Sequence, residues 1–94
     1  MQPSEYVIVG EFSNDTKHEL RLFLEMTCEE VFLAPGLQIE LLARPNPDLL
    51  PVHVAAIEGG LQIFPFRDFD PDWHIRFKGK VFKPGYPTRL TSAD

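Results

Sequence analysis

The sequence predicts a single all-β domain, an antiparallel β-sandwich or small barrel of about seven to eight short strands, Ig-like or jelly-roll-like in layout. Three observations support this fold class. The chain has 94 residues and is 44% hydrophobic, which suits one domain (residues 1–94) with its own core. Its nine prolines are spread between Pro3 and Pro87, and interior proline breaks helices. Several segments alternate apolar and polar residues between turn-forming residues, as half-buried strands do.

The clearest strand is predicted at residues 18–26, where strict alternation places two sets of side chains on opposite faces. The inward face is expected to hold Leu20, Leu22, Leu24 and Met26. Phe23 lies on the opposite face among charged residues. A first strand is expected at residues 6–12, which are mainly β-branched and aromatic, and residues 13–16 form a turn cluster after it.

The middle of the chain is predicted to form four short strands separated by turn signals. They cover residues 30–33, 37–44, 52–57 and 61–66. Pro35-Gly36 separates the first two, and residues 45–51, with three prolines, form a loop before the third. Glu58-Gly59-Gly60 predicts a tight hairpin between the last two. Leu42 breaks the alternation of its strand, so we expect it on the outer side.

The C-terminal third begins with an acidic loop at residues 67–72 and continues with strands at residues 73–77 and 80–83. We expect the ordered part of the domain to cover roughly residues 5–86, because termini that nothing ties down are mobile. The chain from Tyr86 onward is therefore expected to be a short mobile tail.

Charge and cysteine content predict a soluble cytoplasmic protein. The formal net charge is −5, which argues against nucleic acid and against anionic membrane surfaces as partners. Cys28 is the only cysteine, so no internal disulfide can form, and a lone thiol suits a reducing compartment. The first residues lack the basic and apolar regions of a signal peptide, and no apolar stretch is long enough to span a bilayer.

Residues 24–36, which run from Leu24-Glu25 through Glu29-Glu30 to Pro35-Gly36, resemble a recurring pattern in small uncharacterised bacterial proteins. Residues 60–64 and the turn at residues 78–79 are similar to that pattern in layout, so the resemblance covers roughly two-thirds of the chain. Met26 stands where proline is usual in the pattern, and Cys28 where glycine is usual. The resemblance implies a β-sandwich and brings no activity with it.

A metal site is one alternative, because imidazole and carboxylate are common metal ligands. The residues concerned are His53, His74 and Glu40, in a cupin-like metal- or ligand-binding barrel. No His-x-His follows Pro35-Gly36, and the two histidines become neighbours only if their strands pair. We therefore favour histidines on the solvated outer faces of their strands, and we expect no cofactor.

No set of nucleophile, base and acid is recognised, so we expect a protein without catalytic residues rather than an enzyme. Apolar residues on the second faces of the strands point instead to protein contact. The interaction face is predicted to hold Phe23, Leu42, Ile57, Phe64, Phe66 and Trp73. The function predicted from the sequence is thus a protein-interaction or self-association module, whose partner is a second copy or an unidentified protein.

Overall fold

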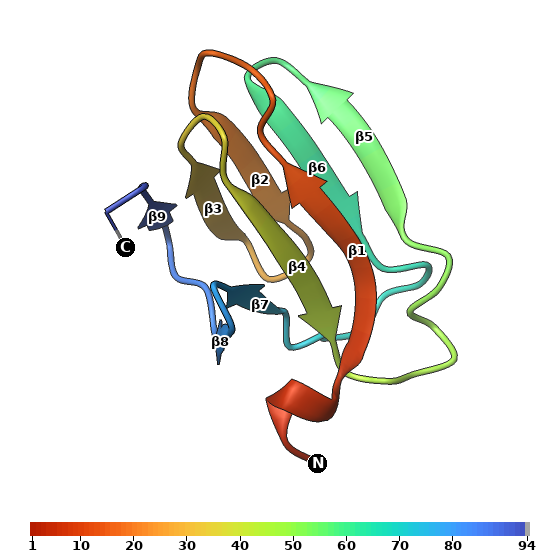
Figure 1. The fold of residues 1–94 in the computed structure, drawn as a ribbon. Helices are drawn as coiled ribbons and strands as arrows, with labels where there is room; N and C mark the ends of the chain where they lie inside the picture. Colours follow the sequence, from red (N-terminus) through yellow and green to blue (C-terminus); the bar gives the residue numbers. More distant parts are fainter. Residues whose placement is uncertain (94) are drawn as a thin grey trace.

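The computed structural model describes residues 1–93 and consists of two packed β-sheets, which confirms the predicted all-β sandwich (Figure 1). The sheets do not close into a barrel, and the part of the chain described contains no α-helix, only the 3-10 turn η1 (Pro3–Glu5). The strands are β1 (Val7–Ser13), β2 (Leu20–Leu24), β3 (Glu29–Leu33), β4 (Gln38–Ala43), β5 (His53–Ile57), β6 (Gly60–Phe64), β7 (His74–Phe77), β8 (Lys80–Phe82) and β9 (Thr88–Leu90).

The four-stranded sheet has the order β1-β4-β7-β8, and the five-stranded sheet has the order β5-β6-β2-β3-β9. All pairs of the four-stranded sheet are antiparallel, as predicted. The five-stranded sheet is mixed, because β2 pairs with β6 and β3 pairs with β9 in parallel. The expectation of a purely antiparallel fold is therefore wrong for this sheet. The chain passes through β4 of the other sheet before it returns as β5 and β6, and β6 then runs beside β2 in the same direction. A parallel neighbour of this kind requires a long connection rather than a hairpin.

The core lies between the sheets, and the alternation of β2 explains how it forms. Leu22 and Leu24 are fully buried, as predicted from the sequence. Met26 is 52% exposed instead, because β2 ends at Leu24 and the next residues turn away toward β3. Apolar residues of the other strands complete the core, and Trp73, just before β7, is fully buried among them.

Asn14 joins the end of β1 to the five-stranded sheet. It is fully buried, and its side-chain nitrogen donates hydrogen bonds to the carbonyl oxygens of His18 and Leu33. Its side-chain oxygen accepts hydrogen bonds from the backbone nitrogen and the hydroxyl of Thr16. The polar cluster predicted as a turn therefore also fixes where the loop enters the sandwich.

Two glycines position the β5–β6 hairpin. Gly59 has φ of 85°, a conformation that side chains disfavour, and lies in the two-residue loop between Ile57 and Gly60. A Cβ at Gly60 would overlap the carbonyl oxygen of Arg21, so the lack of a side chain allows β6 to pair with β2. The hairpin predicted at this Gly-Gly pair is confirmed.

The chain continues as regular structure beyond Tyr86, so the predicted start of the tail is wrong. Residues Thr88–Leu90 form β9, which pairs with β3, and Leu90 is only 4% exposed. This short strand brings the number of strands within residues 1–93 to nine. Asp94, the last residue of the predicted mobile tail, lies outside the described residues.

Candidate interaction face

Three of the six predicted interaction residues lie together on the outer face of the five-stranded sheet. Leu61 and Ile63 of β6 pack toward the core, so Phe64 points to the opposite side. Phe23 is the partner of Gln62 on that outer side, and Ile57 is the partner of Gly60. Phe23 and Phe64 are partly exposed and Ile57 is 38% exposed, so solvent reaches this surface.

Near β9, this face consists of the Phe32 ring and the two arginines that lie over it. Phe32 of β3 has Arg21 as its partner on β2 and Arg89 as its partner on β9. The guanidinium carbons lie 5.0 Å and 4.6 Å from the centre of the Phe32 ring, within the range of cation–π attraction. We use "outer face" for the surface made by Arg21, Phe23, Phe32, Ile57, Phe64 and Arg89.

Both arginines of the outer face also have a carboxylate nearby. A nitrogen of Arg21 lies 3.7 Å from Glu30, and one of Arg89 lies 3.1 Å from Glu19. These pairs are exposed, so each stabilises the fold by less than about 1 kcal/mol. Each guanidinium group therefore contacts both the Phe32 ring and a carboxylate. Arg21 of the central strand β2 thus lies among the aromatic residues of the outer face, and Arg89 lies at its β9 edge.

Two of the predicted interaction residues are buried, so their assignment to an exposed face is wrong. Leu42 and Trp73 have no exposed surface. Leu42 does lie on the outer side of β4, as predicted, but η1 and Tyr6 cover that side. The Tyr6 ring packs edge-on against His74, the cross-strand partner of Leu42, with 5.6 Å between ring centres.

Trp73 is held inside the sandwich by its indole N–H, which donates a 2.7 Å hydrogen bond to the carbonyl oxygen of Glu25. The sixth predicted residue, Phe66, follows β6 and is 48% exposed. The guanidinium of Arg67 lies 4.7 Å from the centre of its ring. Phe66 is therefore accessible, but it belongs to a loop rather than to the outer face.

The structure does not bring the three candidate metal ligands together. His53 lies on β5 of the five-stranded sheet, whereas His74 and Glu40 lie in the four-stranded sheet. The carboxylate of Glu40 accepts a 2.7 Å hydrogen bond from Arg76. Within residues 1–93 no group of three His, Cys, Asp or Glu side chains could hold a metal ion.

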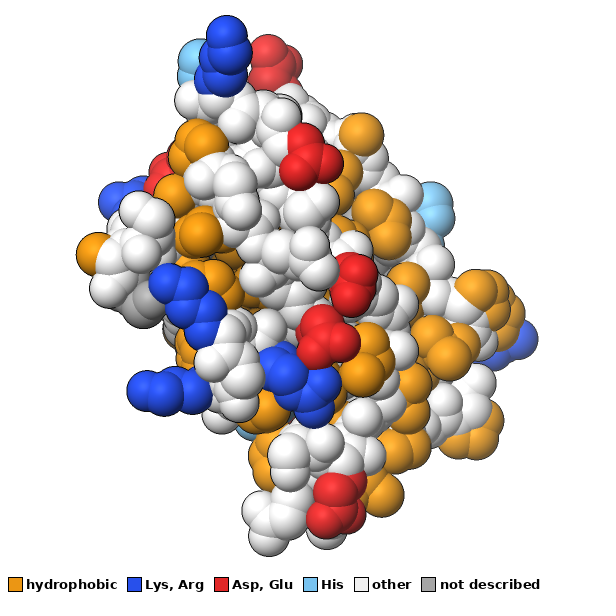
Figure 2. Space-filling view, in the orientation of Figure 1, with side chains coloured by type: hydrophobic (Ala, Val, Ile, Leu, Met, Phe, Trp, Pro, Cys, Tyr) orange, Lys and Arg blue, Asp and Glu red, His pale blue; other side chains and the backbone are white. Residues whose placement is uncertain are grey.

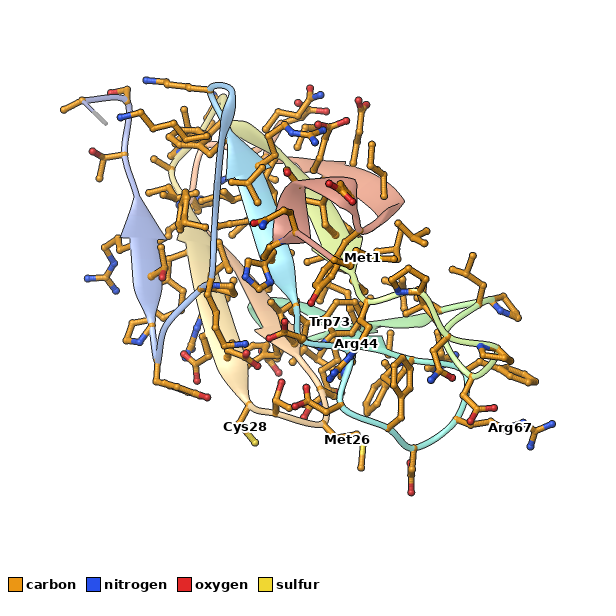
Figure 3. The ribbon with its side chains drawn as sticks, turned by 90° about the horizontal axis from the view of Figure 1, so that it is seen from below. Met1, Met26, Cys28, Arg44, Arg67 and Trp73 are labelled. Carbon is orange, nitrogen blue, oxygen red and sulfur yellow. The ribbon has the colours of Figure 1, made fainter. Side chains whose placement is uncertain are left out.

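His74 is only 8% exposed, so the expectation that it is solvated is wrong. Its Nδ1 lies 2.8 Å from the backbone oxygen of Asp72, and the Tyr6 ring covers it. His53 is exposed, as expected, and its ring contacts that of Phe64. Cys28 is also exposed, in the turn between β2 and β3 (Figure 3).

A polar network closes one end of the sandwich and was not predicted from the sequence. Glu29 is 1% exposed, and the Lys83 nitrogen lies 3.4 Å from its carboxylate and 2.8 Å from that of Asp72. Asp72 also accepts a 2.8 Å hydrogen bond from the Tyr6 hydroxyl, and Glu29 accepts one from the Thr27 hydroxyl. The network therefore links the N-terminal segment to β3, to β7 and to the end of β8.

Charge pairing shifts the pKa values within this network. The hydrogen bond from Lys83 lowers the pKa of Asp72, although burial opposes this. Burial acts to lower the pKa of Lys83, but its bonds and charge interactions with Asp72 and Glu29 raise it overall. The hydrogen bond to Asp72 raises the pKa of Tyr6. Every charged group has a partner, which is typical of a structural network rather than of a reactive site.

A groove of about 490 Å³ lies at the side of the sandwich formed by β8 and β9. Its lining consists of Phe77, Lys78, Lys80, Phe82 and Leu90. Phe77 and Leu90 also contact the core, so the groove opens where the two sheets separate at their edges. The lining combines an apolar surface with two ammonium groups.

Comparison of the chain with protein-family models, with curated proteins and with solved structures gives no match. Membership of the bacterial family that the sequence resembles therefore stays a prediction. Among residues 1–93, none lies in a helix long and apolar enough to cross a membrane.

Proposed function

We propose that this protein is a non-enzymatic module that binds another protein through the outer face of its five-stranded sheet. The observation that carries the proposal is the grouping of Phe23, Phe64 and Ile57 on one accessible surface. The exposed face of a sheet suits a protein partner better than a small molecule, which needs a concave site.

The composition of the outer face supports this function. Arginine and aromatic residues are enriched at the centres of protein interfaces, where a few side chains carry most of the binding energy. Arg21 and Arg89 already lie against Phe32, so less side-chain entropy is lost when a partner contacts them. The Arg21 guanidinium also lies 4.9 Å from the Phe23 ring and so links the two aromatic parts of the face.

The experiment compares proteins captured from the host by the wild type and by outer-face variants. Phe23→Thr and Phe64→Thr remove the two partly exposed rings while keeping a residue that favours strands. Tyr86→Thr is the matched control, because it removes an aromatic ring that is 70% exposed and lies in the segment between β8 and β9 rather than on β2 or β6. Melting temperatures measured beforehand show whether each variant is folded.

We expect the wild type and Tyr86→Thr to retain the same protein, and both outer-face variants to lose most of it. Purified partner then gives a dissociation constant that rises at least about tenfold in each outer-face variant, as loss of an interface anchor does. Equal retention by all four proteins, or retention of nothing by the wild type, would contradict the proposal.

The groove between β8 and β9 favours a second candidate function, the binding of a small amphiphilic anion. Its volume of about 490 Å³ lies in the usual range for ligand sites, and its lysines complement a carboxylate while its Phe and Leu side chains accept an alkyl chain. Calorimetry with octanoate, with octanol as the matched neutral ligand, tests this. Binding of octanoate alone, weakened by Lys80→Gln, supports it; equal binding of both ligands, or of neither, contradicts it.

A further inference from the structure

The four free edges of the two sheets differ in how they are protected from pairing with another chain. Edge strands are usually kept apart by charges, proline, bulges or short length. β1 has a bulge between Ile8 and Gly10 and carries Glu11. β8 and β9 have three residues each, with a cation in both, Lys80 and Arg89.

β5 has none of these protections. It has five residues, His53–Ile57, and contains no Asp, Glu, Lys, Arg, Pro or Gly. Its pairing with β6 is regular over all five residues, without a bulge. In Figure 1 the strand lies at the side of the molecule with nothing beyond it, and Figure 2 shows hydrophobic atoms along that side.

The hairpin geometry shows which backbone groups face the free edge. Ile57 and Gly60 close a two-residue loop and so form a hydrogen-bonded pair. Hydrogen-bonded pairs alternate along an antiparallel ladder, so Ala55 and His53 also bond to β6. The N–H and C=O groups of Val54 and Ala56 therefore point away from the sheet. Val54 is 43% exposed and Ala56 is also exposed, so another strand can reach them.

We propose that β5 pairs antiparallel with β5 of a second copy of this chain, about a two-fold axis at Ala55. This goes beyond the proposed function, because it uses the free edge of the five-stranded sheet rather than its outer face. Ala55 is the midpoint of the strand, so this is the two-fold register in which all five residues of both strands are paired. Val54 then faces Ala56 of the second copy, and these two residues exchange both backbone hydrogen bonds.

The side chains of β5 fit a second copy. In this register Val54 lies opposite Ala56 of the second copy, His53 lies opposite Ile57 of the second copy, and the two Ala55 residues face each other. No acidic or basic residue therefore lies opposite another one. Val54 and Ala56 lie on the same face of the sheet as the core residues Ile63 and Leu61, yet they are exposed. Pairing would remove part of this apolar surface from water. It would also join the two outer faces into one continuous ten-stranded sheet, five strands from each copy.

Disulfide trapping tests the register. Cys28 is exposed, so both variants are made with Cys28→Ser to avoid linkage through it. The two Ala55 residues form a non-hydrogen-bonded pair with Cα atoms about 4.5 Å apart, which a disulfide can bridge. The two Ala56 residues would lie on a diagonal of about 7–8 Å, beyond easy reach of a disulfide.

We expect Ala55→Cys to give a covalent dimer under mild oxidation at least about tenfold faster than Ala56→Cys, because only the former has the distance that a disulfide requires. Equal rates for the two variants, or no dimer from either, would overturn the proposed register.

A second measurement tests the pairing without a covalent bond. Ala56→Pro removes an N–H that faces the free edge and leaves the bonds to β6 intact, so the domain should still fold. Light scattering over a concentration series should show the wild type moving from monomer to dimer and the variant staying monomeric. A wild type that remains monomeric at millimolar concentration, or a variant that dimerises equally well, would refute the pairing.

These experiments use purified protein and variants of β5 alone. Their failure would exclude the second copy as the partner of this edge but would leave the capture by Phe23 and Phe64 unaffected. Conversely, if the outer-face variants capture the partner as well as the wild type does, the proposed function is rejected. The disulfide-trapped dimer could still form in that case.

Discussion

Replacing Lys83 by methionine should destabilise the fold by about 2 kcal/mol at neutral pH. Glu29 is 1% exposed, and Lys83 is the cation that neutralises it, at 3.4 Å. Removing one partner of a fully buried ion pair costs about 3–5 kcal/mol, because the other charge stays buried. The Lys83 side chain is 50% exposed, so water can partly replace it, and we expect a smaller effect. Methionine keeps most of the aliphatic stem, which limits the loss of packing.

The pH dependence of this effect follows from the directions of the pKa shifts. The pKa of Asp72 is lowered in the fold from its ordinary 3.8, so Asp72 stabilises the fold above that value and the contribution is lost as the pH falls through the lowered pKa. Lys83 has a raised pKa, so its contribution is present below 10.5 and is lost as the pH rises through the raised value. The difference between wild type and Lys83→Met should therefore be constant near neutral pH and shrink in strong acid.

Urea unfolding followed by the fluorescence of the single, buried tryptophan measures this difference. For a domain of this size about 2 kcal/mol corresponds to a fall of roughly 8–16 °C in melting temperature. Lys80→Met is the matched control, because Lys80 is exposed and lies outside the network. If Lys83→Met changes stability by less than about 0.5 kcal/mol, or no more than the control, the network does not contribute as we argue.

Three further substitutions test how the sandwich is held together. Trp73→Phe removes the indole hydrogen bond to Glu25 and should cost about 1–3 kcal/mol, measured by circular dichroism; a neutral change would mean that water replaces the donor. Asn14→Ala removes four hydrogen bonds of a buried side chain and should cost about 3 kcal/mol in urea unfolding, whereas a loss below about 1 kcal/mol would contradict its linking role. Gly60→Ala should destabilise more than Gly59→Ala in thermal melts, because only the former forces backbone overlap; the reverse order would show the hairpin can move.

The sequence was informative where local alternation within a strand decided the answer, although it failed at Met26, which lies beyond the end of β2. Leu22 and Leu24 point inward because neighbouring residues of a strand face opposite sides, and that rule needs no knowledge of partners. The Gly-Gly hairpin was predictable from the local turn residues, which also require no knowledge of distant partners. Leu42 was also placed on the correct side of its strand, but its burial depends on Tyr6 and η1, which come from a distant part of the chain.

The outer face was predictable only in part. Phe23, Ile57 and Phe64 stood out because they are apolar residues facing away from the core. The stack of arginines on Phe32 was missed, because it needs β2, β3 and β9 side by side. No pattern in the sequence indicates that Arg89 lies next to Phe32, since parallel pairing joins segments far apart and the chain near Arg89 was expected to be a tail.

The unequal size of the two sheets leaves β5 with an exposed edge, and the proposed partner would pair there. A five-stranded sheet extends beyond a four-stranded one, and Val54 is 43% exposed although it lies on the same face as the core residue Ile63. A lysine at position 54 would protect the edge at little cost to packing, as charged residues do on other edge strands. The other three edges carry such charges, and β5 carries none. This difference is explained if β5 is covered by another strand, since a charge there would prevent the pairing.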